Sequence, residues 1–181
     1  MNHGRVIARL KEFEGCVSHM YQCTGGDVTI GVGHAILAAA DAVNLSWSVS
    51  GSPATAAQAQ SDFAKVAAAP KGLAAGKYEG LTQCRLSADD IDALLLSDVE
   101  LFESKLGGAL PRWPHYPEPA QEALFDMGYN LGVAGLLKFH GLLAAADAGQ
   151  WTTAAARCHR RGIGEARNRE TAKLFLEAAG A

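Results

Sequence analysis

The stretch from Phe13 to His34, FEGCVSHMYQCTGGDVTIGVGH, decides how the fold of this chain is interpreted. The apolar residues that lead into it recur at helical spacing, which predicts a short helix that ends near Glu14–Gly15. Residues 24–27, TGGD, are a turn signal, and residues 28–32 are rich in β-forming side chains. We therefore expect one helix followed by a small hairpin or short sheet.

The chain that follows is mostly helical in pattern. Ser52–Pro53 pairs a capping residue with a proline at the first helical position, which predicts a helix over about 54–67. Ser87–Asp90 resembles a capping box in front of an apolar helical stripe. The proline-rich residues 110–119 are expected to be irregular, and further helical patterns occupy residues 120–132, 133–148, 151–160 and 168–180.

The expected fold class is therefore α+β and mostly helical, within a single domain that spans residues 1–181. We expect a small β-containing lobe over about 15–50. A helical lobe is expected over about 85–181 together with the N-terminal helix. A cleft between two such lobes is a natural place for a polymeric ligand.

The composition is that of an ordinary globular protein. Of the 181 residues, 49% are hydrophobic and 19% are charged, and the net charge is −3. This balance lacks the excess of basic residues that is typical of proteins that bind nucleic acid. No run reaches the roughly 20 apolar residues that a membrane span needs, and the N-terminal MNHGRVIARLKEFEG lacks the apolar core of a secretory signal peptide. We expect a monomer made in the cytoplasm, without stable membrane insertion.

The cysteines show no CxxC pair and no spacing typical of metal ligands. Neither a metal nor a cofactor is implied. We expect free, partly buried thiols, because an even number of cysteines does not by itself imply disulfides. The four positions are Cys16, Cys23, Cys84 and Cys158.

Glu14 is the first candidate for chemistry, since it closes the predicted helix. The partial negative charge at a helix C-terminus disfavours ionisation of a nearby carboxyl, and partial burial would act in the same direction. A glutamic acid that stays protonated near neutral pH is able to donate a proton to a leaving glycosidic oxygen. From composition alone, the alternative is an exposed glutamate at a helix end.

The pattern around Glu14 resembles the signature of glycoside hydrolase family 24, the phage-type lysozymes. In that family a Glu is followed, after eight residues, by an Asp and, after five more, by a Thr, and the hairpin ends in a TIGxGH run. Here Glu14–Gly15, Tyr21 and residues 29–34, TIGVGH, stand at the matching positions. Residues 125–132, FDMGYNLG, resemble the family's central helix, and Asn168–Arg169 resembles its closing segment.

The resemblance implies a lysozyme-like fold and a muramidase that cleaves the β-1,4 bond between N-acetylmuramic acid and N-acetylglucosamine in peptidoglycan glycan strands. It implies that Glu14 is the catalytic acid, that Thr29 helps to place water, and that Arg169 orients Glu14. Arg167 is the alternative to Arg169. For His34, a hydrogen bond with a structural partner is favoured over a catalytic role.

Cys23 stands where the family carries its second catalytic carboxylate. A thiol with an ordinary pKa of about 8.5 is only a few per cent thiolate at pH 7, and an ionised Glu14 nearby would lower that fraction. Cys23 is therefore a thiolate nucleophile or base, a spectator, or a sign of lost activity. Asp27 is a further candidate for the missing carboxylate, because on a strand it shares a face with Thr29.

Two rival functions remain at this stage. One is a non-catalytic peptidoglycan- or protein-binding module, because a fold does not dictate a function. The other is a lytic transglycosylase, which needs the acid but no activated water. As a muramidase, the protein would act in the periplasm or at the cell wall after export by a holin or a secretion system. It would be a phage endolysin or an antibacterial effector, and an effector would have an immunity protein. The role of residues 35–86 stays open.

Overall fold

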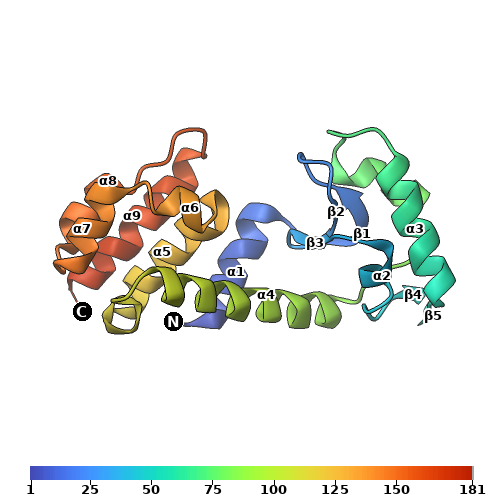
Figure 1. The fold of residues 1–181 in the computed structure, drawn as a ribbon, viewed down its shortest axis with the longest axis horizontal. Helices are drawn as coiled ribbons and strands as arrows, with labels where there is room; N and C mark the ends of the chain where they lie inside the picture. The colour runs from blue at the N-terminus through green and yellow to red at the C-terminus, as the bar shows by residue number, and fades with distance from the viewer. Residues whose placement is uncertain (181) are drawn as a thin grey trace. The chain divides into compact units, whose positions relative to one another are not determined.

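The computed structural model describes residues 1–180 and has the α+β, mostly helical architecture that the sequence predicts (Figure 1). The chain divides into two compact units: Leu10–Asp98, and Met1–Arg9 with the chain from Val99 onward. We describe each unit by itself. No helix among residues 1–180 is long and apolar enough to cross a membrane.

A three-stranded antiparallel sheet lies at the centre of the Leu10–Asp98 unit. Its strands are β1 (Val17–Gln22), β2 (Val28–Gly31) and β3 (His34–Ile36), in the order β1-β2-β3. Tyr21 pairs with Thr29 across the first ladder, and Ile30 pairs with His34 across the second. The prediction of a small sheet in this stretch is confirmed.

The helix before the sheet also ends where the sequence predicts. Helix α1 spans His3–Glu14, and Gly15 follows with a φ of +77°. Glycine adopts this left-handed conformation without steric cost, so it is the usual residue just after a helix. The N–H of Gly15 donates to the carbonyl of Lys11, 3.1 Å away, and satisfies one of the last carbonyls of the helix.

The next predicted helix exists, but its start was placed wrongly. Ser52–Pro53 forms the short strand β5, paired with β4 (Ser48–Val49), and does not cap a helix. Helix α3 spans Ala56–Ala68, and its N-cap is Thr55, which forms a capping box with Gln58. A hydroxyl side chain caps the helix, as predicted, but the residue is Thr55, three positions after Ser52. The other helices of this unit are α2 (Ala39–Ala42), η1 (Ala75–Lys77), η2 (Glu79–Leu81) and the first half of α4 (Ala88–Ala109).

Buried polar side chains tie α3 to the sheet. The amide of Gln22, at the end of β1, donates to the carbonyls of Val66 at 2.6 Å, Ala67 at 3.1 Å and Ala69 at 3.2 Å. These carbonyls lie at the C-terminal end of α3, where the regular helical hydrogen bonds end. That of Val66 also accepts the N–H of Ala69 at 3.1 Å. One side chain therefore both satisfies the helix end and fixes it against β1.

Asp62 makes a second buried connection from α3. One of its carboxylate oxygens accepts the N–H groups of Gln83 at 2.6 Å and Cys84 at 2.8 Å, and the other pairs with Lys65 at 3.1 Å. Burial raises the pKa of Asp62, but these hydrogen bonds outweigh burial and leave the pKa below its ordinary value. The ionised carboxylate holds the segment after η2 against α3.

The second unit is helical. Its central helix α5 spans Glu118–Leu131, and every residue from Ala120 to Gly128 is buried. This confirms that residues 120–132 form an interior helix. Helices α5 and α8 both pack on α9, and α7 packs on α8. The remaining bounds are η3 (Trp113–His115), α6 (Val133–Leu136), α7 (His140–Asp147), α8 (Trp151–Arg157) and α9 (Glu165–Ala179).

We expect Asp62→Asn to lower the free energy of unfolding by about 1–3 kcal/mol at pH 7, because the charge-assisted hydrogen bonds weaken. A carboxylate whose folded pKa is depressed stabilises the protein above its unfolded pKa, and this stabilisation is lost as the pH falls through the folded value. The deficit of the variant should therefore shrink below about pH 4. Urea unfolding at several pH values measures it.

The matched control is Asp89→Asn, which changes an exposed carboxylate in the first turn of α4. We expect it to cost under about 1 kcal/mol. An Asp62→Asn deficit that is no larger than that of the control, or that does not depend on pH, would contradict the role given to Asp62.

Candidate active site

Glu14, the predicted acid, is the last residue of α1, immediately before the glycine that ends the helix. Its side chain is exposed. An exposed glutamate at a helix end is the alternative that composition alone suggested, and the structure has that exposure.

The turn between β1 and β2 is closed by two backbone hydrogen bonds. The N–H of Cys23 donates to the carbonyl of Asp27 at 3.0 Å, and the N–H of Gly26 donates to the carbonyl of Cys23 at 2.9 Å. Gly25 passes close to the thiol, because a Cβ at this position would lie 3.5 Å from the sulfur of Cys23. The turn therefore wraps around the Cys23 side chain.

Hydrogen-bond donors surround this half-buried thiol. Burial raises the pKa of Cys23, but the donors outweigh burial and leave the pKa below its ordinary value. Backbone N–H groups that converge in this way form an anion-binding arrangement. The donors are the backbone N–H groups of Gly25, Gly26 and Asp27 and the hydroxyl of Thr29.

The lowered pKa favours the thiolate among the alternatives that the sequence left open for Cys23. There the thiol of Cys23 was expected to be a few per cent ionised, and less beside an ionised Glu14. The donors of the turn reverse the direction of the net effect. The hydroxyl of Thr29 has a single proton, which is donated to the carbonyl of Asp27 at 2.9 Å in this structure. Ionisation of the thiol gives that proton a second, charged acceptor.

Tyr21 shows that Glu14 and Cys23 lie in one neighbourhood. Burial raises the pKa of Tyr21, and the negative charges of Cys23 and Glu14 raise it further. Both groups therefore lie within electrostatic range of the phenol. Tyr21 also pairs directly with Thr29 in the ladder, so their side chains share one face of the sheet. The sequence analysis used Tyr21 only as part of a motif and gave it no role.

Asp27 lies in the turn, outside β2, which begins at Val28. Its side chain is exposed, whereas that of Thr29 is only 2% exposed. The expectation that Asp27 and Thr29 share a strand face is therefore wrong. The carboxylate of Asp27 lies beside Gly25, with one oxygen 3.7 Å from where a Cβ of that glycine would be.

His34 has the structural partner that the sequence analysis favoured. Its Nδ1 lies 3.0 and 2.9 Å from the two carboxylate oxygens of Asp98. Both side chains are about a quarter exposed, at 29% and 23%. This pair joins the start of β3 to α4 within the Leu10–Asp98 unit.

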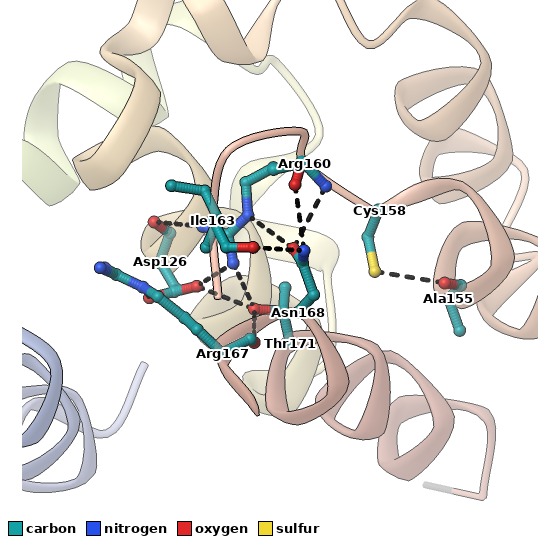
Figure 2. Close-up of polar contacts among 8 residues, drawn as sticks. All are labelled: Asp126, Ala155, Cys158, Arg160, Ile163, Arg167, Asn168 and Thr171. Carbon is teal, nitrogen blue, oxygen red and sulfur yellow. Dashed lines mark hydrogen bonds and ion pairs between the residues drawn. The ribbon is translucent and has the colours of Figure 1, made fainter. Parts of the chain in front are cut away.

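The arginines of the closing segment differ sharply in their surroundings. Arg169 is exposed on α9, and Arg167, two residues earlier, is buried. Figure 2 shows Arg167 beside Asp126 of α5, with its Nε donating to a carboxylate oxygen at 2.9 Å. The other oxygen of Asp126 accepts from Arg160 at 2.8 Å and from Thr171 at 2.8 Å. A buried carboxylate thus fixes two guanidinium groups.

Arg160 is almost completely buried in this cluster, with 1% of its surface exposed. Asn168 holds it from the other side, since its amide donates to the carbonyl of Arg160 at 3.0 Å and its oxygen accepts the N–H of Arg160 at 3.1 Å (Figure 2). A buried cation needs such a set of partners, because its desolvation costs several kcal/mol. The sequence had given no role to Arg160 or to Asp126, although Asp126 lies in the 125–132 motif.

The four cysteines are free thiols, as expected. Within residues 1–180, no group of three or more His, Cys, Asp or Glu side chains is placed to hold a metal ion. The chain matches neither a protein-family model nor a curated protein sequence. Assignment of a protein class therefore depends on the residues of the Glu14–Thr29 stretch.

We expect Thr29→Val to slow the alkylation of Cys23 by iodoacetamide about three- to tenfold at pH 7, because loss of the hydroxyl donor raises the pKa of the thiol. The rate is measured by mass spectrometry in a Cys16→Ser background, so that the exposed Cys16 does not compete. Burial raises the pKa of Cys84 to about 11, so that thiol reacts slowly.

The matched control is Thr24→Val, an exposed threonine of the same turn that is absent from the donors around the thiol. It should leave the alkylation rate within about twofold. Equal rates for the two variants would show that the Thr29 hydroxyl does not stabilise the thiolate.

Proposed function

We propose that this protein is a glycoside hydrolase with a lysozyme-like fold that cleaves the β-1,4 bond between N-acetylmuramic acid and N-acetylglucosamine in peptidoglycan. One observation carries the proposal: the turn around Cys23 favours an anion at the position where the resemblance to family 24 expects a carboxylate. Glu14 and Cys23 both act on the phenol of Tyr21, so an acid and a second anionic group share one neighbourhood.

Glu14 is the proton donor in this proposal. Cleavage of a glycosidic bond passes through a transition state with positive charge on the sugar, and the leaving oxygen needs a proton. The exposed position of Glu14 leaves its carboxyl accessible to a polymeric substrate.

Cys23, as a thiolate, is the second catalytic group. A negative charge on its sulfur stabilises the positive charge that develops on the sugar, and it accepts a proton from the attacking water. The hydroxyl of Thr29 reaches both the sulfur and the backbone of the turn, which suits it to position that water. Asp27 is the weaker candidate, because its exposed carboxylate lacks the ring of donors that surrounds Cys23.

The resemblance gives the role of orienting the acid to Arg169, with Arg167 as the alternative. Both assignments stay predictions. Arg167 is held at its Nε by Asp126, whereas Arg169 is exposed.

A muramidase of this kind acts at the cell wall, so the proposed setting is the periplasm or wall after export by a holin or a secretion system. The proposed partners are peptidoglycan glycan strands and, for an effector, an immunity protein. The ionised thiol gives no reason to prefer a pure binding module, since binding of a neutral sugar does not require an anion at Cys23.

We expect Glu14→Gln to lower the rate of clearing of a peptidoglycan suspension at least about 100-fold, because the amide keeps the size of the side chain but has no proton to donate. The matched control is Glu12→Gln on the same helix, also exposed, which should stay within about twofold of wild type. Turbidity gives the rate, and circular dichroism checks the fold.

Two outcomes would contradict this proposal. If Glu14→Gln clears the suspension as fast as wild type, Glu14 is not the acid. If the folded wild-type protein binds peptidoglycan without clearing it, the protein is a binding module. A 1,6-anhydro end on the released sugars, in place of a reducing end, would instead identify a lytic transglycosylase.

Variants of Cys23 test the second catalytic group. We expect Cys23→Asp to keep at least about a tenth of the wild-type rate, because a carboxylate is also an anion that accepts the donors of the turn. The clearing rate of Cys23→Ser should fall about 100-fold or more, since a hydroxyl stays neutral at pH 7. Equal activity of Cys23→Ser and wild type would show that Cys23 is a spectator.

A further inference from the structure

Lys71 lies against the turn that surrounds Cys23. A Cβ at Gly26 would lie 2.7 Å from both Cε and Nζ of Lys71, so the end of the lysine side chain runs along this glycine. Gly26 also has a φ of +94°, a left-handed conformation that other residues rarely adopt. The glycine therefore allows both the turn and the close approach of the ammonium group.

The chain that carries Lys71 is held in place on its N-terminal side. The hydroxyl of Tyr78, a completely buried residue, donates to the carbonyl of Pro70 at 2.7 Å. The amide of Gln22 donates to the carbonyl of Ala69 at 3.2 Å. Because Gln22 precedes Cys23 in the chain, the same residue fixes both the loop that presents Lys71 and the start of the turn.

The charge of Lys71 has no acidic partner within residues 1–180. Two other cations of this unit have acidic partners, since Lys65 pairs with Asp62 and Arg85 with Glu79. Lys71 is exposed, so its ammonium stays hydrated until a ligand replaces the water. The stabilisation of the thiolate comes from neutral backbone and hydroxyl donors, which leaves the ammonium available to another anion.

We propose that Lys71 is a specificity-determining residue that binds a carboxylate of the substrate next to the Cys23 turn. This inference rests on the proposed muramidase function. The carboxylate has two sources in peptidoglycan: the lactyl group of muramic acid where the peptide has been removed, and the peptide itself where it is present. An ammonium binds either one as a point charge, without a required orientation. This gives a function to part of residues 35–86.

The test compares strands that differ only in this charge. One pair is peptide-free glycan strands with free lactyl carboxylates, and the same strands after conversion of these groups to methylamides. The second pair is strands that carry the peptide, with its carboxylates free or amidated. Kinetics for wild type, Lys71→Gln and Lys77→Gln give KM and kcat separately. Lys77 is an exposed lysine of the same segment and is the matched control.

We expect wild type and Lys77→Gln to prefer a charged substrate over its neutral form by about five- to tenfold in kcat/KM, through KM. Lys71→Gln should abolish this preference. If Lys71→Gln loses the preference for charge within the peptide-free pair, the lactyl carboxylate is the ligand. If it loses the preference within the peptide-bearing pair alone, the ligand is a carboxylate of the peptide. Either result supports the proposal.

Three results would overturn it. The first is a wild type that shows no preference for charge in either pair, and the second is a preference that survives in Lys71→Gln. The third is a kcat/KM that falls equally in Lys71→Gln for charged and neutral strands, which would mean that Lys71 acts on Cys23 and not on the substrate.

Failure of the proposed function is distinguishable from failure of this inference. If wild type cleaves none of the strands, the muramidase proposal fails. Titration calorimetry with the same strands then still decides the role of Lys71: a dissociation constant that rises about five- to tenfold in Lys71→Gln for the charged strands alone supports it. A dissociation constant that is the same in both proteins, or no binding by either, rejects it.

Discussion

The backbone hydrogen bond from Cys23 to Asp27 is the constraint on which the candidate site depends. It closes the turn after β1, and the N–H groups of Gly25 and Asp27 in this turn lower the pKa of the thiol. These donors are backbone atoms, so their positions follow from the register of β1 and β2 and not from side-chain rotamers. A slip of one residue would move every side chain of β1 to the opposite face and break the arrangement.

The same register places Tyr21, Gln22 and Cys23 in three different environments. Gln22 is buried and binds the carbonyls at the end of α3. Its neighbour Tyr21 points to the opposite face, as alternation along a strand requires, and there it is half-buried within range of both candidate catalytic charges. Cys23 enters the turn. The buried amide of Gln22 thus anchors the strand one residue before Cys23.

Local patterns in the sequence predicted the parts of the fold that local physics decides. The end of α1 at Glu14 and the strand at Val28–Gly31 follow from periodicity, a glycine and a turn signal, all within a few residues of one another. The partners of Asp62 at Gln83 and Cys84 lie 21 and 22 residues away. Contacts of this kind depend on the completed fold, so no short pattern reveals them. The cap of α3 was misplaced because two candidate caps, Ser52 and Thr55, stand close together, and only pairing with β4 excludes the first.

The candidate site was predictable in its residues but not in its electrostatics. The resemblance to family 24 pointed to Glu14, Cys23 and Thr29, but a sequence pattern does not reveal how many N–H groups converge on a sulfur. That number affects the chemistry, because hydrogen-bond donors lower the pKa of a thiol and so increase its thiolate fraction. Stabilisation of the thiolate by neutral dipoles has a further consequence. A formal cation paired with Cys23 would be neutralised by it, whereas backbone donors leave the ammonium of Lys71 available to the substrate carboxylate that we propose it binds.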